Sequence, residues 1–416
     1  MVRLPPRLRP LFPYLKPAYT HATRLVAPTS QRLSRFRGGY LPTGVVYSME
    51  DAAHSTGGTC AVARPAELVA RPAAKGIPAG NPTFAASDGT LIPRVAVAEL
   101  PRGRVLGDKR AIITGNGDLL QEQSIYFGTS RPREHPLFLH PFPDPPLEFD
   151  GRLGVLASRG DGNYYHFLVD VLARIGVLEQ TPQIAPPDRW YVPAGAAFQR
   201  ELLDMFGLTP DRVLDSNAHP HVRAKTLVVP GLPATDVLNP PWVTDFLRRR
   251  LVKPSHLQAS GPPIYVTRGS GANNRRVVNE PDVLALLTAR GFQPLDPGAM
   301  TVAEQISAFA AAPVIVSPHG AALTNIIFAS PGAAVIEFLP GAEVLPDCYW
   351  TLAYSVPGVD YRYLISDGRS SRPTLASALV EDIVVDLAAL EQLLDDVANR
   401  PDRPGVEQSS PHASES

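Results

Sequence analysis

Two histidines stand in sequence contexts that suit proton transfer or anion binding. The first is His166, in the segment Asn163-Tyr164-Tyr165-His166, four residues before Asp170 and eight before Arg174. In a helix this spacing places the three polar side chains on one face. A histidine with a carboxylate partner can act as the general base toward a hydroxyl group, or Asp170 can be the base while His166 positions the substrate. The alternative is a surface stripe in which Asp170 pairs with Arg174.

The second histidine, His319, lies in the loop Ser317-Pro318-His319-Gly320-Ala321-Ala322, between an apolar run and a helical segment. Small residues at a helix start leave backbone N–H groups open, and such groups bind phosphate. Glu337 ends the next apolar strand and is placed to accept hydrogen bonds from two ribose hydroxyls. His319 can donate to phosphate or sugar oxygens. The alternative is a tight strand-to-helix turn with a locally bonded histidine.

A glycine-rich loop at 268–276 carries three arginines, Arg268, Arg275 and Arg276, directly after an apolar strand. Guanidinium groups can hold a diphosphate leaving group as its bond breaks, without help from a metal. The sequence has no Asp-X-Asp spacing of the kind that chelates a metal–diphosphate. The alternative is a solvated basic loop.

The elements that must position these residues divide the chain into three regions. Residues 40–150 are mostly short strands, and 141–146 form a proline-rich connection. From 151 strands and helices alternate, which indicates a parallel sheet with helices on its faces. In the first region we expect strands near 45–47, 95–97, 111–114 and 124–127, with hairpin turns at 88–89 and 115–118. In the second we expect strands near 153–157, 190–192 and 227–229, with helices from Asn163 to about 179 and over 242–251.

A second α/β unit begins at residue 264 and has Rossmann-like spacing. Its helices have clear boundary signals: Asn279 can cap one that Gly291 ends, and Thr301 with Glu304 forms a capping box for the next. A last amphipathic helix is predicted over about 380–397, and the polar tail from 401 is predicted to be disordered. Strands are expected near 264–267, 292–295, 314–316 and 335–338.

Composition narrows the classes of function. The net charge of -1 argues against a nucleic-acid-binding protein, and two cysteines, Cys60 and Cys348, make neither a disulfide framework nor a zinc site. The first 40 residues are basic and proline-rich, with no Asp or Glu before Glu50. They predict a disordered tail, with attraction to an anionic membrane surface as the alternative. No apolar run is long enough for a spanning helix or a signal peptide, so the sequence predicts a cytoplasmic protein. If the basic segment binds lipid, the protein is peripheral at the inner face of the membrane.

Together these segments resemble glycosyltransferase family 61, which includes eukaryotic O-linked N-acetylglucosaminyltransferases, plant xylan-modifying transferases and bacterial capsular polysaccharide proteins. The resemblance spans roughly residues 150–345. It is carried by four segments, which are 163–170, 265–268 with 275–280, 317–325 and 335–338. One departure is Ala173, where many relatives have a proline.

The resemblance implies a GT-B architecture of two facing Rossmann-like domains, here with a β-rich N-terminal region. The implied domains are an acceptor-side domain at 41–250 and a donor domain at 251–345, followed by a packing extension at 346–400. It also implies inverting sugar transfer from a nucleotide sugar to a carbohydrate or glycoconjugate acceptor, with no metal and no other cofactor. Arg268 and Arg276 would contact the diphosphate and Glu337 the ribose. The remaining donor-side residues would be Arg275, Ser317, His319, Gly320, Ala321 and Asn325. On the acceptor side, His166 and Asp170 would be catalytic, with Asn163, Tyr164, Tyr165 and Arg174 beside them.

The sequence leaves a second class of function open, which is a nucleotide- or sugar-binding protein without catalysis. Such a protein would keep the arginine loop and Glu337 but could dispense with His166 and Asp170. A dehydrogenase is disfavoured, because the Gly-X-Gly-X-X-Gly pattern after a first strand is missing.

Overall fold

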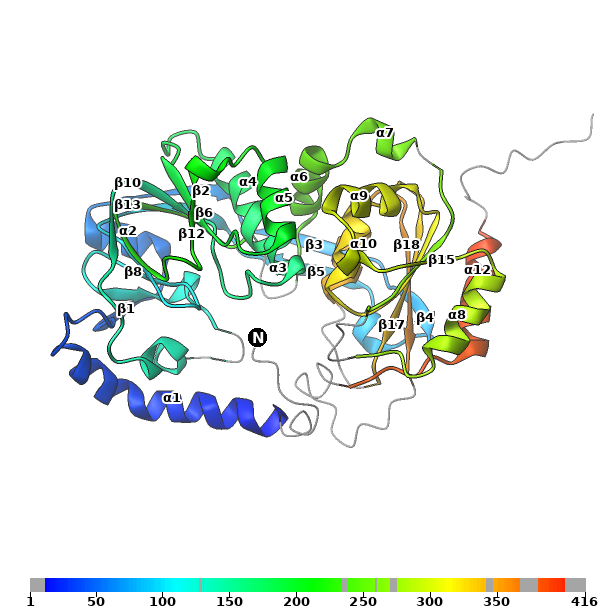
Figure 1. The fold of residues 1–416 in the computed structure, drawn as a ribbon, viewed down its shortest axis with the longest axis horizontal. Coiled ribbons are helices and arrows are strands. Elements are labelled where there is room, and N and C mark those ends of the chain that lie inside the picture. Colours follow the sequence, from blue (N-terminus) through cyan, green and yellow to red (C-terminus); the bar gives the residue numbers. More distant parts are fainter. Residues whose placement is uncertain are drawn as a thin grey trace, which may run out of the picture.

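The computed structural model describes residues 12–126, 129, 131–233, 238–258, 260–269, 275–341, 347–366 and 381–400. The chain forms a mixed α/β structure with two main sheets that lie side by side in Figure 1. The loops with the predicted site residues follow the carboxyl ends of strands in both sheets. The α/β class predicted from the alternating pattern is therefore confirmed.

The first sheet combines an antiparallel and a parallel part. Its described strands follow the order β1-β9-β8-β7-β13-β10-β11-β12, and β6 and β2 extend from β13. The parallel part is built on β10 (Leu147–Val155), which lies between β13 (His221–Pro230) and β11 (Arg189–Val192). The other strands are β1 (Gly44–Val46), β2 (Thr59–Arg64), β6 (Val95–Pro101), β7 (Arg104–Leu106), β8 (Ala111–Ile113), β9 (Asp118–Leu120) and β12 (Val213–Asp215).

The second sheet is parallel throughout its described strands, in the order β15-β14-β16-β17-β18-β4. Its central strands β16 (Val314–Pro318) and β17 (Ala334–Leu339) are almost completely buried, as expected for a sheet covered on both faces. The other strands are β14 (Ile264–Val266), β15 (Gln293–Leu295), β18 (Asp360–Ile365) and β4 (Lys75–Ile77).

Strand β4 comes from the N-terminal part of the chain, yet it completes the edge of the second sheet. It is reached through a two-stranded hairpin, β3 (Glu67–Arg71) with β5 (Ser87–Ile92). Within this excursion Phe84 is buried and stacks on Tyr363, with ring centroids 4.0 Å apart. In Figure 1 the blue β4 accordingly lies among the yellow and orange elements. The excursion ties the two sheets together in a way that the local pattern of residues 65–92 did not indicate.

Helices cover both sheets and meet between them. The junction contains α3 (Tyr164–His166), α5 (Ala197–Met205), α6 (Pro241–Leu251), α9 (Val302–Ala311) and the 3₁₀ helix η9 (Ala321–Phe328). Hydrogen bonds cross it: the Tyr164 hydroxyl donates to Asn325 Oδ1 at 2.8 Å, and Arg248 Nη1 donates to the carbonyl of Ala329 at 2.8 Å. The far side of the second sheet is covered by α8 (Glu280–Ala289) and α12 (Leu387–Ala398). The structure also contains the helices α2 (Met49–Thr56), α7 (Pro254–Leu257) and α10 (Asp347–Tyr354).

Several local predictions are confirmed. Asn163 and Thr301 cap helices through their side chains, and Glu304 returns the bond to Thr301. Gly291 follows α8 with a φ of 82°, the left-handed conformation that favours glycine. Both cysteines are free thiols, with Cys348 buried and Cys60 half-buried.

Other local predictions are wrong. Residues 12–34 of the supposed disordered tail form the helix α1 (Phe12–Ser34), which packs small residues such as Ala27 against the body. Residues 88–89 lie inside β5 rather than in a hairpin turn, and 124–126 form no strand. The last helix starts at 387, and the extension after 345 also supplies β18. The tail from 401 lies outside the described residues.

Among the residues described, no helix has both the length and the apolar character needed to cross a membrane.

Candidate active site

The helix that carries the first histidine changes its winding at the predicted catalytic residues. The Asn163 side chain accepts a hydrogen bond from the backbone N–H of Tyr165 at 2.9 Å, which starts the helix. The helix is α-helical over α3, π-helical over η6 (Phe167–Leu172) and α-helical again over α4 (Ala173–Glu179). Single π turns are frequent at functional sites, because the extra residue redirects side chains. The sequence predicted the helix and its cap, but not this turn.

His166 and Asp170 form the predicted pair. His166 Nδ1 lies 2.7 Å from Asp170 Oδ2, and the two side chains are 17% and 9% exposed. With Nδ1–H donating to the carboxylate, neutral His166 carries its lone pair on Nε2. Gly160 approaches the ring so closely that a Cβ there would lie 2.9 Å from His166 Cδ2. The backbone and Asp170 together fix the orientation of this imidazole.

The loop before His166 is held by an ion pair that sequence reasoning missed. Arg110 Nε donates to Asp161 Oδ2 at 2.9 Å, and both side chains are almost fully buried. Arg110 also donates to the carbonyl of Ser216 at 2.8 Å and to Asn217 Oδ1 at 2.7 Å. Burial raises the pKa of Asp161, and the Arg110 charge opposes that shift. The partners are about 50 to 107 residues apart in sequence, so no local pattern could have linked them.

Arg174 does not join the His166–Asp170 pair. Its side chain is 1% exposed, and Nη1 donates to the carbonyl of Val155 at 3.2 Å. Nη2 lies 3.3 Å from Gln123 Oε1. The predicted face assumed one continuous α-helix, and the π-helical segment at 167–172 breaks that periodicity. Arg174 therefore joins the end of β10 to the helix from inside, which does not support direct contact with an acceptor.

The second histidine also has a carboxylate partner. His319 Nδ1 lies 2.5 Å from Glu337 Oε1, and the Tyr361 hydroxyl donates to Glu337 Oε2 at 2.5 Å. Glu337 is completely buried. Both carboxylate oxygens are thus engaged by protein groups, which is not the arrangement expected of a ribose ligand. The position of Glu337 corresponds instead to a residue that orients His319.

His319 lies in a strongly desolvated and positive environment. Burial lowers its pKa, the Glu337 carboxylate opposes this shift, and the charges of Arg275 and Arg268 lower the pKa further. Arg268 Nη1 donates to the backbone carbonyl of His319 at 2.6 Å. A Cβ at Gly320 would lie 2.3 Å from Arg268 Nη1, so this approach needs a residue without a side chain.

Two of the three loop arginines turn toward this site, and the third turns away. Arg268 and Arg275 each have a buried Nε with no hydrogen-bond partner among the described residues. Burial, with Arg275 nearby, lowers the pKa of Arg268 to about 10, and burial also lowers the pKa of Arg275. Arg276 is exposed and pairs with Asp382, Nη2 to Oδ2 at 3.2 Å. The expectation that Arg276 contacts the diphosphate therefore moves to its neighbour Arg275.

A line of aromatic rings connects the two histidines. The His166 ring meets Tyr165 edge-on with centroids 5.2 Å apart, and Tyr165 meets Tyr349 of α10 at 5.8 Å. Tyr349 then meets His319 at 4.9 Å. Both tyrosines are buried, and burial raises the pKa of each well above its usual value. The His166 site and the His319 site therefore lie on either side of one aromatic layer, which consists of Tyr165 and Tyr349.

The remaining predicted residues divide between lining and support. Ser317 is buried and donates to the carbonyl of Pro318 at 3.0 Å, while Ala321 is half-buried at the start of η9. Asn325 is fully buried between Tyr164 and Gln305, to which it donates at 2.8 Å. Ser317 and Asn325 thus support the loop from inside. Within the described parts of the chain, no three His, Cys, Asp or Glu side chains cluster closely enough to hold a metal ion.

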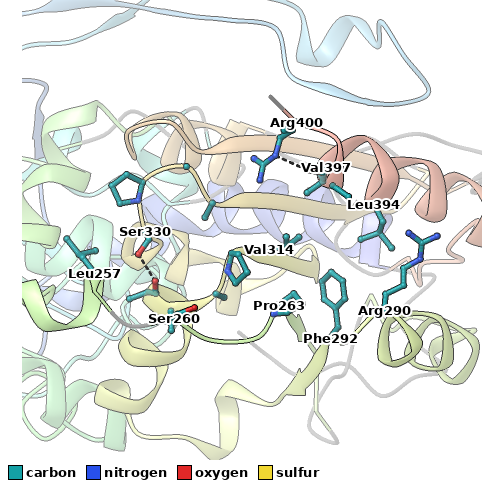
Figure 2. A pocket seen from close by; sticks show the side chains of 18 residues that line it. Leu257, Ser260, Pro263, Arg290, Phe292, Val314, Ser330, Leu394, Val397 and Arg400 are labelled. Atoms are coloured by element: carbon teal, nitrogen blue, oxygen red, sulfur yellow. Dashed lines mark hydrogen bonds between the residues drawn. The ribbon is translucent and has the colours of Figure 1, made fainter. Parts of the chain in front are cut away.

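A separate cavity of about 590 Å³ lies at the opposite edge of the second sheet. Figure 2 shows residues from the starts of its strands lining this cavity, among them Pro263, Phe292 and Val314. Its two arginines already have carboxylate partners, Arg290 with Asp395 and Arg400 with Asp360. Ligands of open α/β sheets bind beyond the carboxyl ends of the strands, so this cavity is not the candidate site.

Comparisons with known proteins agree with the resemblance. Residues 164–336 match the family model Glycosyltransferase 61. The chain is similar to three proteins named Protein O-linked-mannose beta-1,4-N-acetylglucosaminyltransferase 2. Identity is 39% over 119 residues in Bos taurus, 34% over 129 residues in Canis lupus familiaris and 35% over 128 residues in Mus musculus. These matches cover 26%, 28% and 29% of this chain but 20%, 21% and 21% of the relatives. The chain therefore spans about a fifth of the length of these relatives.

The comparisons contradict the predicted cytoplasmic location at the inner face of the membrane. The relatives' names describe enzymes that modify O-linked mannose on proteins, and enzymes of that kind typically act in the lumen of the secretory pathway. The prediction rested on the absence of a long apolar run, which does not determine a compartment.

Proposed function

We propose that this chain, whose residues 164–336 carry the family 61 match, transfers a sugar from a nucleotide-sugar donor to an acceptor hydroxyl in glycoconjugate or polysaccharide biosynthesis. One observation carries the proposal: a histidine–carboxylate pair on the first sheet and two buried arginines beside His319 on the second lie on either side of the same aromatic layer. A base and an anion cradle at one junction are what this reaction requires.

In the proposed reaction the donor diphosphate lies against Arg268 and Arg275. Each has a buried Nε–H group that finds no acceptor among the described residues, and phosphate oxygens would satisfy these groups. Glu337 and Tyr361 hold His319 in place beneath the donor. Because the arginines stabilise the leaving group directly, the proposal needs no metal, and chelation should leave turnover unchanged.

Proton transfer is assigned to the other half of the site. His166 Nε2, with Asp170 on Nδ1, takes the proton of the acceptor hydroxyl. The hydroxyl oxygen forms a bond to the anomeric carbon as the bond from that carbon to the diphosphate oxygen breaks. One displacement without a glycosyl–enzyme intermediate inverts the anomeric configuration. The two sheets would then be the facing halves of a GT-B-like arrangement, with β18 and α12 part of the donor half.

The relatives' names give the first substrates to test. N-acetylglucosamine is the first sugar for the donor panel, and a peptide bearing O-linked mannose is the first acceptor. Nucleoside diphosphate sugars are screened for thermal stabilisation of the full chain, then incubated with acceptor with and without a chelator. The proposal predicts one stabilising donor and a product of inverted configuration by NMR. Retained configuration, or activity lost on chelation and restored by Mn²⁺ or Mg²⁺, would contradict the mechanism. Binding without turnover would indicate a non-catalytic protein.

A further inference from the structure

A small polar cavity of about 190 Å³ lies in the first sheet, apart from the candidate active site. It is lined by three arginines, Arg102, Arg104 and Arg223, and by the turn at 114–117. Arg223 lies near the start of β13, where its register partner on β10 is Glu148. Glu148 is seven residues before Val155, the last residue of β10. At the rise of a strand this is on the order of 20 Å from the end of β10 that leads to His166. The cavity is therefore independent of the proposed donor pocket.

The fold brings the three arginines together from separate segments. Arg104 on β7 and Arg223 on β13 are direct partners in an antiparallel ladder. Arg102 lies in the turn before β7, where its φ of 53° is unusual for a residue other than glycine. The 114–117 turn packs directly on that turn, since a Cβ at Gly115 would lie 2.4 Å from the carbonyl oxygen of Pro101. The cavity is thus bordered by two tight turns and two strands.

Among the residues that the structure describes, carboxylates balance only part of the positive charge around this cavity. Like charges directly opposite each other on neighbouring strands destabilise a sheet. Burial, assisted by Arg223, lowers the pKa of Arg104 to about 10. Arg223 pairs with Glu148 at 2.8 Å, but no carboxylate pairs with Arg102 or Arg104 among the residues the structure describes. Three guanidinium groups therefore share one carboxylate.

The partners of Arg104 in the described part of the chain are neutral: a carbonyl group, an imidazole and the ring of Tyr40. Arg104 Nη1 donates to the carbonyl of Tyr40 at 2.5 Å and lies 3.4 Å from His221 Nε2. His221 Nδ1 lies 2.6 Å from the carbonyl oxygen of Asp144 and must donate to it. Burial lowers the pKa of His221 to about 4, so its Nε2 is an acceptor at neutral pH. A buried guanidinium held by neutral acceptors and facing another arginine is a ready partner for an anion.

We propose that this cavity binds a tetrahedral oxyanion, a phosphate or sulfate group carried by a larger ligand. Arginine forks match the geometry of such groups, and the volume holds one group with a few waters at about 30 Å³ each. Because the cavity is remote from His166, the bound group would anchor the ligand and take no part in sugar transfer. The proposal does not depend on the proposed function.

The experiment is isothermal titration of the full chain with inorganic phosphate and, separately, inorganic sulfate, at ionic strength matched with NaCl. Arg102→Asn removes the exposed guanidinium while keeping a residue that tolerates positive φ, and Arg223→Gln removes the second charge without emptying the core. We expect saturable binding that each substitution weakens about tenfold or more. Phosphate and sulfate binding alike would indicate a general oxyanion site, and preference for one would name the ester to seek.

Two controls separate this site from the donor pocket and from general charge. Arg189→Asn removes an exposed arginine elsewhere on the same sheet and should leave binding unchanged. Arg275→Gln removes an arginine of the proposed donor site and should leave unchanged the binding component that Arg102→Asn and Arg223→Gln weaken. The proposal is overturned if neither anion binds saturably. It is equally overturned if neither Arg102→Asn nor Arg223→Gln weakens any component of the binding, or if Arg275→Gln alone removes all of it.

Discussion

Two histidine–carboxylate pairs lie on opposite sides of the junction between the sheets, and their surroundings differ. The His166–Asp170 pair lies on one helix, and its side chains are 17% and 9% exposed. The His319–Glu337 pair joins a loop to a buried strand, its side chains are 7% and 0% exposed, and Tyr361 occupies the second carboxylate oxygen. Two arginines act on His319 in addition.

The difference shows that the residue types alone do not assign a role. A base must exchange protons with a bound hydroxyl, so it needs an accessible nitrogen and a carboxylate that stabilises the imidazolium. The first pair is the more exposed of the two, and Asp170 lies at Nδ1, where it can stabilise the imidazolium. In the second, burial disfavours the imidazolium, which suits a neutral ring that donates or accepts a hydrogen bond beside an anion. We therefore assign proton transfer to His166 and donor positioning to His319.

The strongest way to break this assignment is to remove the proposed base. His166→Ala should lower kcat by about 10²- to 10⁴-fold, the usual contribution of general base catalysis. Donor affinity, measured by titration with the nucleoside diphosphate, should stay within about twofold, because the proposed diphosphate contacts belong to the other sheet. Loss of donor affinity comparable to the loss of turnover would contradict the division of roles.

The second test compares two adjacent arginines. Arg275→Ala should weaken binding of the nucleoside diphosphate by about 10- to 100-fold, as expected when a charge-assisted hydrogen bond to phosphate is lost. Arg276→Ala is the matched control, because this side chain is exposed and pairs with Asp382. Titration should show weaker binding of the nucleoside diphosphate for Arg275→Ala than for Arg276→Ala. Equal losses of affinity would contradict the assignment of the diphosphate contact to Arg275 rather than Arg276.

The third test concerns the support beneath His319. Tyr361→Phe removes the hydrogen bond to Glu337 Oε2 and leaves a buried carboxylate oxygen without that donor. The free energy of unfolding should fall by about 1–3 kcal/mol, as measured by urea denaturation. Tyr47→Phe, at an exposed tyrosine, should have no effect. Equal stability of the two variants would show that Glu337 does not depend on Tyr361.

The smallest expected effect is on pH dependence. Burial lowers the pKa of His319 in the folded state, so the unfolded chain binds a proton first, near the ordinary value of about 6.5. Stability from this residue is therefore complete above about pH 6.5 and is lost as pH falls toward the folded-state pKa. Urea denaturation at two pH values should show a slope of stability against pH that His319→Gln reduces by less than about 1.4 kcal/mol per pH unit, the contribution of one proton. His135 and His221, with pKa values lowered by burial to about 4, contribute with the same sign and remain in both proteins. An unchanged slope would contradict the lowered pKa of His319.

Local signals in the sequence were enough to predict much of the scaffold. Side-chain caps at Asn163 and Thr301 form as predicted, because a cap depends on residues within one helical turn. The buried strand before His319 was also evident, since a strand covered on both faces is a continuous apolar run. The candidate residues on both half-sites could be selected from these elements.

Features that depend on distant contacts could not be predicted. The π turn after His166 has no distinct residue pattern and moved Arg174 into the core. Arg275 and Arg276 are neighbours with identical chemistry, and their directions differ because Asp382, more than 100 residues away, takes Arg276. Tyr361 and Tyr349 come from a region assigned to packing alone, and β4 joins a sheet whose other strands begin at residue 264.

The most direct measurement places His166→Gln and His319→Gln in the same two assays, kcat at saturating donor and affinity for the nucleoside diphosphate. His166→Gln should lose turnover with affinity retained, whereas His319→Gln should weaken affinity and retain more turnover at saturation. If the two variants lose turnover and affinity in the same proportion, or exchange these effects, the two histidine–carboxylate pairs do not have the separate roles assigned to them.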